Sequence, residues 1–152
     1  MSRFTGHLGL EPLEDENGLP ILTDDGRTQW KALAPPLIYD VGELGSGEEI
    51  TFPPGATTDL GSIPRPAWSL GFSPDGPGVK IFVIHDFLYH TGGTCEFEGT
   101  TYRTRETPYT RKEADDILRE GLKILNVGSI RRALIWSAVR LGGSSGWKSL
   151  RA

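Results

Sequence analysis

Residues 79–90 read VKIFVIHDFLYH, and this stretch determines how the rest of the chain is interpreted. Wound as a helix, its apolar side chains surround the axis on every side, and such a helix is buried inside a domain. Pro77 just before it and Gly92-Gly93 after it are typical of a helix start and a helix end. We predict a buried central helix, with a strand over 79–84 as the alternative for its β-branched half.

His85 and Asp86 interrupt the apolar character of this stretch. A buried carboxylate without a partner costs too much to stay ionised, so Asp86 is expected to be paired, metal-bound or protonated. A buried neutral imidazole at position 85 also needs a hydrogen-bond partner. These two residues are therefore the first candidates for a functional site.

Two further helices are expected after the central one. Thr110-Arg111-Lys112-Glu113 matches a capping box. The apolar stripe that follows it contains Ala114, Ile117, Leu118, Gly121, Leu122 and Leu125, and residues 126–128 close this helix. Ser129 caps the last helix, before Gly142-Gly143 and a polar tail. Its expected core-facing stripe contains Ile130, Ala133, Leu134, Ser137, Ala138 and Leu141.

The N-terminal part has the pattern of short strands. Apolar runs at 19–22, 37–41 and 49–52 are bounded by turn residues, and Pro53-Pro54 ends the last run because proline donates no ladder hydrogen bond. Residues 59–78 form a constrained loop with four prolines, and residues 94–110 suggest a hairpin or a mobile loop.

These elements predict an α+β fold in a single domain over 1–152. A small antiparallel sheet from the N-terminal half would pack with about three helices from the C-terminal half. In this division, 1–58 is β-rich, 59–78 is the constrained loop, 79–142 is helical and 143–152 is a polar tail. The alternative is a mostly helical domain with a β-rich arm.

Composition excludes several classes of protein. The formal net charge of -4 argues against a generally basic surface that binds nucleic acid. A single cysteine, Cys95, cannot form an internal disulfide. The opening residues have no signal-peptide pattern, and no run reaches the roughly 18 apolar residues of a membrane span. We therefore expect a soluble protein made in a cytoplasm.

A partner for His85 can be proposed from helical periodicity. Asp115 lies on the flank of the apolar stripe of its helix, whereas Asp116 lies nearly opposite the stripe and should be solvated. Asp115 could therefore reach the imidazole and hold its tautomer. Asp59, at the start of the constrained loop, could complete an oxygen-rich site with Asp86. Such a site suits Ca²⁺, Mg²⁺ or Mn²⁺, or Zn²⁺ with His85 as a direct ligand.

Structural interpretations of the same residues stay open. A His-Asp pair can simply link two elements, Asp59 can cap a turn, and Asp115 can complement a helix dipole. Arg65 can pin the loop to Asp59 or bind an anion. Tyr89, one turn after His85, is expected to pack with a satisfied hydroxyl. Cys95 has no nearby histidine that would make it a nucleophile.

Three segments together resemble the family called domain of unknown function 1353, which is common in tailed phages and prophages. They are TDLGSIPRP at 58–66, HDFLY at 85–89 and RKEADDIL at 111–118, followed by AVRLG at 138–142 and Trp147. The resemblance spans about 50–148, and the first 40 residues carry none of it. It implies an association with phage particles and no defined chemistry.

His-Asp-Phe-x-Tyr on one helix and Arg-x-x-Ala-Asp on the next also resemble the two-helix core of prokaryotic phospholipase A2 enzymes. The resemblance implies that His85 is the general base for a water, Asp86 holds Ca²⁺ and Asp115 orients His85. The chain departs from that pattern because no paired cysteines join the helices and no clear glycine-rich calcium loop precedes them.

We therefore carry three hypotheses for function. The first is a phage-encoded, metal-assisted hydrolase of an envelope ester or amide bond, in lipid or peptidoglycan. The second is a virion, tail or assembly component in which the His-Asp cluster is structural, with an exposed aromatic patch near Trp147 for docking on phage proteins. The third is a counter-defence binding protein. In each case synthesis is expected in the host cytoplasm, with virion association under the second.

Overall fold

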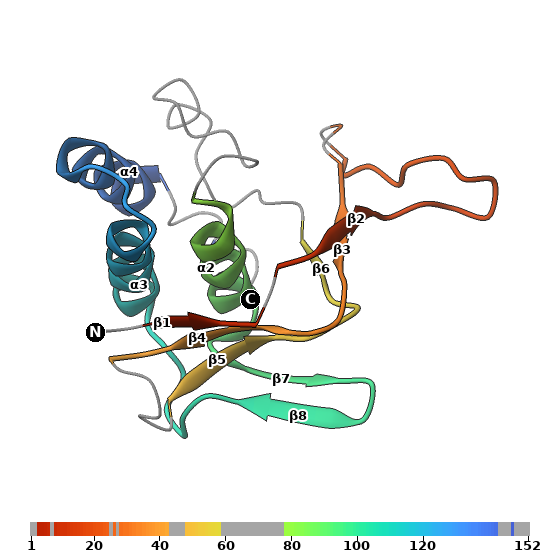
Figure 1. The fold of residues 1–152 in the computed structure, drawn as a ribbon, viewed down its shortest axis with the longest axis horizontal. Coiled ribbons are helices and arrows are strands. Elements are labelled where there is room, and N and C mark those ends of the chain that lie inside the picture. Colours follow the sequence, from red (N-terminus) through yellow and green to blue (C-terminus); the bar gives the residue numbers. More distant parts are fainter. Residues whose placement is uncertain are drawn as a thin grey trace.

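A computed structural model describes residues 3–6, 8–24, 26, 28–42, 48–58, 78–142 and 147 of the chain. Within them it has eight strands and three helices, in the order strand-rich half, helix, hairpin, two helices (Figure 1). The elements are β1 (Arg3–Thr5), β2 (Leu10–Pro12), β3 (Trp30–Ala32), β4 (Leu37–Asp40), β5 (Glu49–Phe52), β6 (Thr57–Thr58), α2 (Val79–Thr91), β7 (Thr94–Phe97), β8 (Thr100–Arg103), α3 (Arg111–Ile124) and α4 (Ser129–Gly142). The expected α+β fold is confirmed.

The strands form small antiparallel sheets in the described residues. One has the order β1-β4-β5, with Leu37 opposite Phe52, and a second has the order β2-β3-β6. Strands β7 and β8 form a hairpin, as one of the two alternatives for residues 94–110 predicted. Strand β5 ends at Phe52, directly before the two prolines, because proline cannot donate a hydrogen bond to the neighbouring strand.

The strand expected at 19–22 is wrong. Only isolated bridges occur there, from Glu14 to Pro20 and from Leu22 to Thr28. The Asp15 carboxylate accepts hydrogen bonds from the backbone N–H groups of Asn17, at 2.8 Å, and Leu19, at 3.0 Å. This side chain therefore organises a turn in place of a regular ladder.

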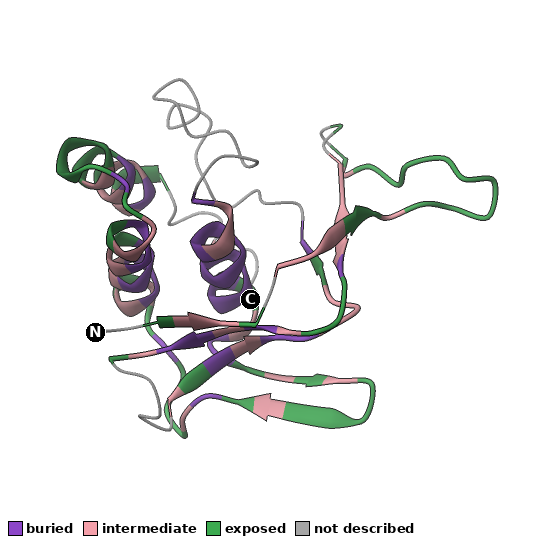
Figure 2. Cartoon of the chain, in the orientation of Figure 1, coloured by how far each residue is buried: buried purple, intermediate pink, exposed green. Residues whose placement is uncertain are grey.

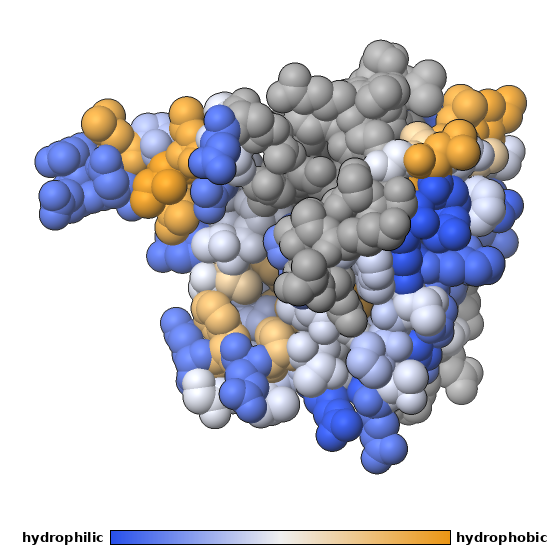
Figure 3. All heavy atoms as spheres, turned by 180° about the vertical axis from the view of Figure 1, so that it is seen from behind, coloured by the Kyte–Doolittle hydropathy of each residue, from blue (hydrophilic) through white to orange (hydrophobic). Residues whose placement is uncertain are grey.

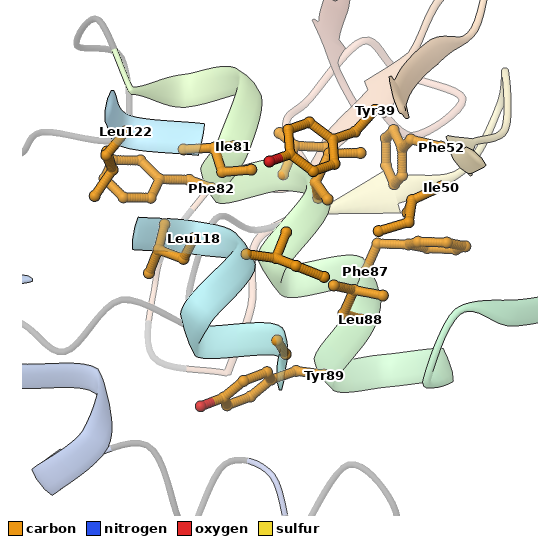
Figure 4. Close-up of a cluster of buried hydrophobic side chains, with 14 of the residues drawn as sticks. Tyr39, Ile50, Phe52, Ile81, Phe82, Phe87, Leu88, Tyr89, Leu118 and Leu122 are labelled. Atoms are coloured by element: carbon orange, nitrogen blue, oxygen red, sulfur yellow. The ribbon is translucent and has the colours of Figure 1, made fainter. Parts of the chain in front are cut away.

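Helix α2 is the centre of the fold. It lies between α3 on one side and the β1-β4-β5 sheet on the other, and its residues from Ile81 to Tyr89 are all buried (Figures 1 and 2). Figure 4 shows side chains from both neighbours converging on this helix, with Phe52 and Ile50 from β5 and Leu118 and Leu122 from α3. Gly92 ends the helix in the left-handed conformation, with φ of 68°. The segment is therefore the expected buried helix, and the alternative of a strand over 79–84 is wrong.

Helix α3 begins with the predicted capping box. The Thr110 hydroxyl accepts from the Glu113 N–H at 3.1 Å, and the Glu113 carboxylate accepts from the Thr110 N–H at 3.1 Å. Its apolar stripe is buried from Ala114 to Leu122, while Leu125 is half-buried. The stripe packs on α2, which brings Asp115 to the helix interface.

The prediction of which face of α4 is buried is wrong. Ile135 and Val139 are its buried residues, whereas Ile130, Leu134 and Leu141 are 77%, 43% and 87% exposed. The guanidinium of Arg111 donates to the Val139 carbonyl at 3.1 Å, and the guanidinium of Arg140 donates to Asp115 at 2.9 Å. These polar contacts orient α4 so that the larger apolar face points outward.

Gly121 allows α2 and α3 to pack closely. A Cβ atom at this position would lie 2.2 Å from Cγ1 of Ile81 on α2. We predict that Gly121→Ala lowers the free energy of unfolding by about 1–3 kcal/mol through overpacking, although alanine is the better helix former. Urea denaturation measures the change. Gly128→Ala is the matched control, because nothing lies within 4 Å of its new Cβ; equal effects of the two substitutions would contradict this account.

Candidate functional site

The carboxylate of Asp115 is the centre of the most connected buried polar network among the described residues. Its Oδ1 atom accepts from Nε2 of His85 at 2.7 Å and from the Tyr89 hydroxyl at 2.7 Å. Its Oδ2 atom accepts from Nη1 of Arg140 at 2.9 Å. Asp115 and His85 are both 0% exposed. One carboxylate therefore joins α2, α3 and α4.

Helical spacing places the donors. His85 and Tyr89 are four residues apart on α2, so their rings lie on the same face with centroids 4.4 Å apart. The Tyr89 ring also packs edge-on against Trp147, at 5.1 Å between centroids. Tyr89 thus packs and satisfies its hydroxyl, as expected. Trp147 is half-buried, and its neighbours in the sequence, where we expected an exposed patch, lie outside the described residues.

Arg111 strengthens the positive surroundings of Asp115. It lies one turn earlier on α3, with Nε 4.0 Å from Oδ2 of Asp115, and its Nη2 donates to the Val139 carbonyl. With Arg140, two guanidinium groups therefore face one carboxylate. Arg111 also binds the C-terminal turn of α4, where carbonyl groups lack partners within the helix.

The network keeps Asp115 ionised. Burial raises the pKa of the Asp115 carboxyl, but the hydrogen bond and charge interaction with His85, together with hydrogen bonds from Tyr89 and Arg140, outweigh burial and lower it overall. Burial and the bond to Asp115 raise the pKa of the Tyr89 hydroxyl, so this group stays protonated and donates. An ionised carboxylate accepts hydrogen bonds only.

This charge state assigns the tautomer of His85. Because Asp115 can only accept, Nε2 of the imidazole carries the hydrogen, and Nδ1 carries the lone pair in the neutral ring. A carboxylate that holds a histidine in this way also stabilises the imidazolium formed when Nδ1 takes a proton. The pair therefore has the electronic arrangement of a general base.

Asp86 belongs to a different network. Its Oδ2 atom accepts from the Thr58 hydroxyl at 2.8 Å, and its Oδ1 atom lies 3.5 Å from Nε2 of His90. It lines a cavity of about 260 Å³ with apolar residues from β5 and β7, and with His90 and Cys95. Burial raises the pKa of the Cys95 thiol, which disfavours the nucleophilic thiolate.

The single cluster expected from the sequence is therefore divided. His85 meets Asp115, whereas Asp86, the next residue along α2, points toward Thr58 and β6. Consecutive helical side chains diverge by about 100°, so His85 and Asp86 bind different partners. Asp59 and Arg65, the other two candidates, lie outside the described residues.

Asp86 and Thr58 could contribute to the binding of a divalent cation, because carboxylate and hydroxyl oxygens are ligands of hard metals. The described residues contain no group of three or more His, Cys, Asp or Glu side chains arranged to hold a metal ion. They therefore do not form a complete metal site by themselves.

Two residues of the Asp115 network escaped the sequence analysis as participants. Arg111 has a detectable signal, since an arginine four residues before an aspartate on a helix lies on the same face. Arg140 has none, because its contact depends on how α4 packs against α3. The hydroxyl of Thr58, the partner of Asp86, likewise required the tertiary structure.

A family model described as Protein of unknown function (DUF1353) matches residues 32–139. The chain belongs to this family. The match starts in β3, earlier than the expected residue 50, and ends within α4, so it includes His85, Tyr89, Arg111 and Asp115 but not Arg140. No curated protein and no solved structure matches the chain. Within the described part, no helix is long and apolar enough to cross a membrane.

We predict that Asp115→Asn lowers the free energy of unfolding by about 3–5 kcal/mol, because two guanidinium groups lose their buried counter-charge. Asp116→Asn is the matched control. Its side chain is 44% exposed and pairs with Lys112, so the expected loss is below about 1 kcal/mol. Chemical denaturation of both variants at pH 7 measures the difference, and similar losses would contradict the central role of Asp115.

The same carboxylate predicts a pH dependence. Its pKa is lowered in the folded state from the ordinary value of 3.8. Its stabilising contribution is therefore present above that value and is lost as pH falls through the folded pKa. The wild-type protein should lose stability on acidification below about pH 4 more steeply than Asp115→Asn. Denaturation midpoints between about pH 2 and 6 test this, and parallel curves would exclude it.

Proposed function

We propose that the chain is a hydrolase of an ester or amide bond in a cell-envelope component, lipid or peptidoglycan, with His85 as the general base. The observation that carries the proposal is the 2.7 Å contact between Nε2 of His85 and the ionised, fully buried Asp115. A histidine oriented by a carboxylate is the usual device for removing a proton from a weak nucleophile near neutral pH.

In the proposed reaction, Nδ1 of His85 takes a proton from water, and the resulting hydroxide attacks the carbonyl carbon. Asp115 stabilises the imidazolium, while Tyr89 and Arg140 hold the carboxylate in place. The proton on Nδ1 then passes to the leaving oxygen or nitrogen as the carbonyl–leaving-group bond breaks. The substrate forms no covalent bond with the enzyme in this reaction.

Asp86, with Asp59 earlier in the chain, would hold the divalent cation of the proposal, Ca²⁺, Mg²⁺, Mn²⁺ or Zn²⁺. A bound cation supplies a Lewis acid for the carbonyl oxygen. The resemblance to the His-Asp core of prokaryotic phospholipase A2 supports a lipid ester among the possible substrates. The association with phage particles that the sequence resemblance implies would favour an envelope substrate.

We predict that His85→Gln reduces turnover by at least about 100-fold, the usual contribution of a general base. The assay uses fluorescent phospholipid vesicles and labelled peptidoglycan, each with Ca²⁺, Mg²⁺, Mn²⁺ or Zn²⁺ and with chelator. Asp116→Asn is the control that should keep full turnover. Circular dichroism and a thermal melt establish that each variant is folded. Unchanged hydrolysis by folded His85→Gln would overturn the proposed role of His85.

A second candidate is a virion, tail or assembly component in which the network is a structural clasp. The observation that favours it is the complete burial of His85 and Asp115, because a general base must reach a water molecule. A carboxylate on α3 that accepts hydrogen bonds from α2 and α4 is also sufficient to hold these three helices together.

This candidate predicts that the chain co-purifies with phage particles. Quantitative mass spectrometry of gradient-purified particles should detect it at a fixed ratio to a major tail protein. In that case His85→Gln should lower the free energy of unfolding. Neither the wild-type protein nor the variant should hydrolyse the envelope substrates. Absence of the chain from purified particles would exclude the structural assignment.

A further inference from the structure

We propose that copies of this chain associate head to tail, with the arm of one copy seated on α4 of the next. The arm comprises residues 13–29, between β2 and β3. The outer face of α4 comprises Ile130, Ala133, Leu134, Ser137 and Leu141. This inference is independent of the function proposed above.

The outer face of α4 is a mainly apolar stripe, interrupted by Ser137, without a partner inside the described chain. Ile130, Leu134, Ser137 and Leu141 are spaced by four, three and four residues, so they lie in one row along the helix. Ile130 is 77% exposed and Leu141 is 87% exposed. Figure 3 shows hydrophobic side chains gathered on the surface at this end of the molecule. An exposed apolar row of this kind marks an interaction surface.

The arm presents a second exposed apolar surface. It projects beyond the body of the domain in Figure 1, and a separate hydrophobic cluster lies at the corresponding end of Figure 3. Leu19, Ile21 and Leu22 are 60%, 38% and 51% exposed. Three large apolar residues exposed within four positions are unusual on a projecting loop.

The two surfaces carry opposite charge. The arm sequence contains Glu14, Asp15, Glu16, Asp24 and Asp25 against one basic residue, Arg27. Helix α4 contains three arginines and no acidic residue; Arg140 is paired with Asp115, which leaves Arg131 and Arg132 as the excess positive charge of the helix. An acidic apolar arm and a basic apolar helix are complementary in both respects. Pairing α4 with α4 would oppose arginines, and pairing arm with arm would oppose carboxylates.

The arm and α4 lie at opposite ends of the molecule (Figure 1). A contact between two different surfaces of the same chain is heterologous, so it adds subunits in one direction until a ring closes or a filament forms. The contact joins one loop to one helix face and should be smaller than the roughly 1,600 Å² of a standard interface. We therefore expect weak association that depends on protein concentration.

Sedimentation velocity of the full chain tests the proposal. The wild-type protein should form species heavier than a monomer at about 0.1 mM and dissociate on dilution. Raising the salt concentration from about 0.05 M to 0.5 M should weaken the association, because charge attraction is screened. A monomer at every concentration up to about 1 mM would overturn the proposal.

Two variants separate the surfaces. Ile130→Gln with Leu134→Gln removes the α4 face, and Leu19→Gln with Leu22→Gln removes the arm surface; each variant alone should be monomeric. Mixed in equal amounts, they should form a dimer and nothing larger, because one intact arm meets one intact helix. Self-association of either variant, or a mixture that stays monomeric, would overturn head-to-tail pairing.

Leu33→Gln is the matched control, because Leu33 is also an exposed leucine, at 40%, but lies outside both surfaces. It should associate like the wild-type protein. Loss of association in this variant would indicate general apolar adhesion and overturn the assignment. Circular dichroism of each variant establishes that the fold is retained, which is expected because each substituted side chain is at least 40% exposed.

Discussion

An ionised carboxylate with no access to solvent must be surrounded by donors, and the hydrogen-bond donors of Asp115, on α3, come from two other helices. His85 and Tyr89 come from α2, and Arg140 comes from α4. The energetic cost of leaving this charge unpaired is large, so each donor restricts the position of the helix that carries it. The orientation of α4 and the tautomer of His85 therefore have a common origin.

The burial of Ile81 to Tyr89 on α2 is the second constraint on the molecule. These residues point to every side of the helix, so they need covering elements all round, and the β1-β4-β5 sheet and α3 provide two of them. The close passage of Gly121 against Ile81 allows α3 to come near enough for Asp115 to reach His85. The packing of the core and the geometry of the candidate site thus depend on the same helix pair.

Polar contacts also determine which face of α4 meets solvent. The helix has apolar residues on two sides, and burial alone would favour the side with more of them. Arg111 and Arg140 hold the other side against α3, which leaves Ile130, Leu134 and Leu141 outside. A surplus apolar face of this kind is available for a partner, and the acidic arm at the other end of the chain has matching chemistry.

The sequence by itself determined the features with a local physical cause. These are the helical period of α2, its glycine stop, the capping box at Thr110, the prolines that end β5 and the position of Asp115 on the flank of α3. The tertiary structure decided the turn at Asp15 that replaces a strand, the divergence of Asp86 from His85, the orientation of α4 and the roles of Arg140 and Thr58. Periodicity reports which residues share a face of one element. Which face is buried, and which distant side chains meet there, depends on contacts between elements that no local pattern contains.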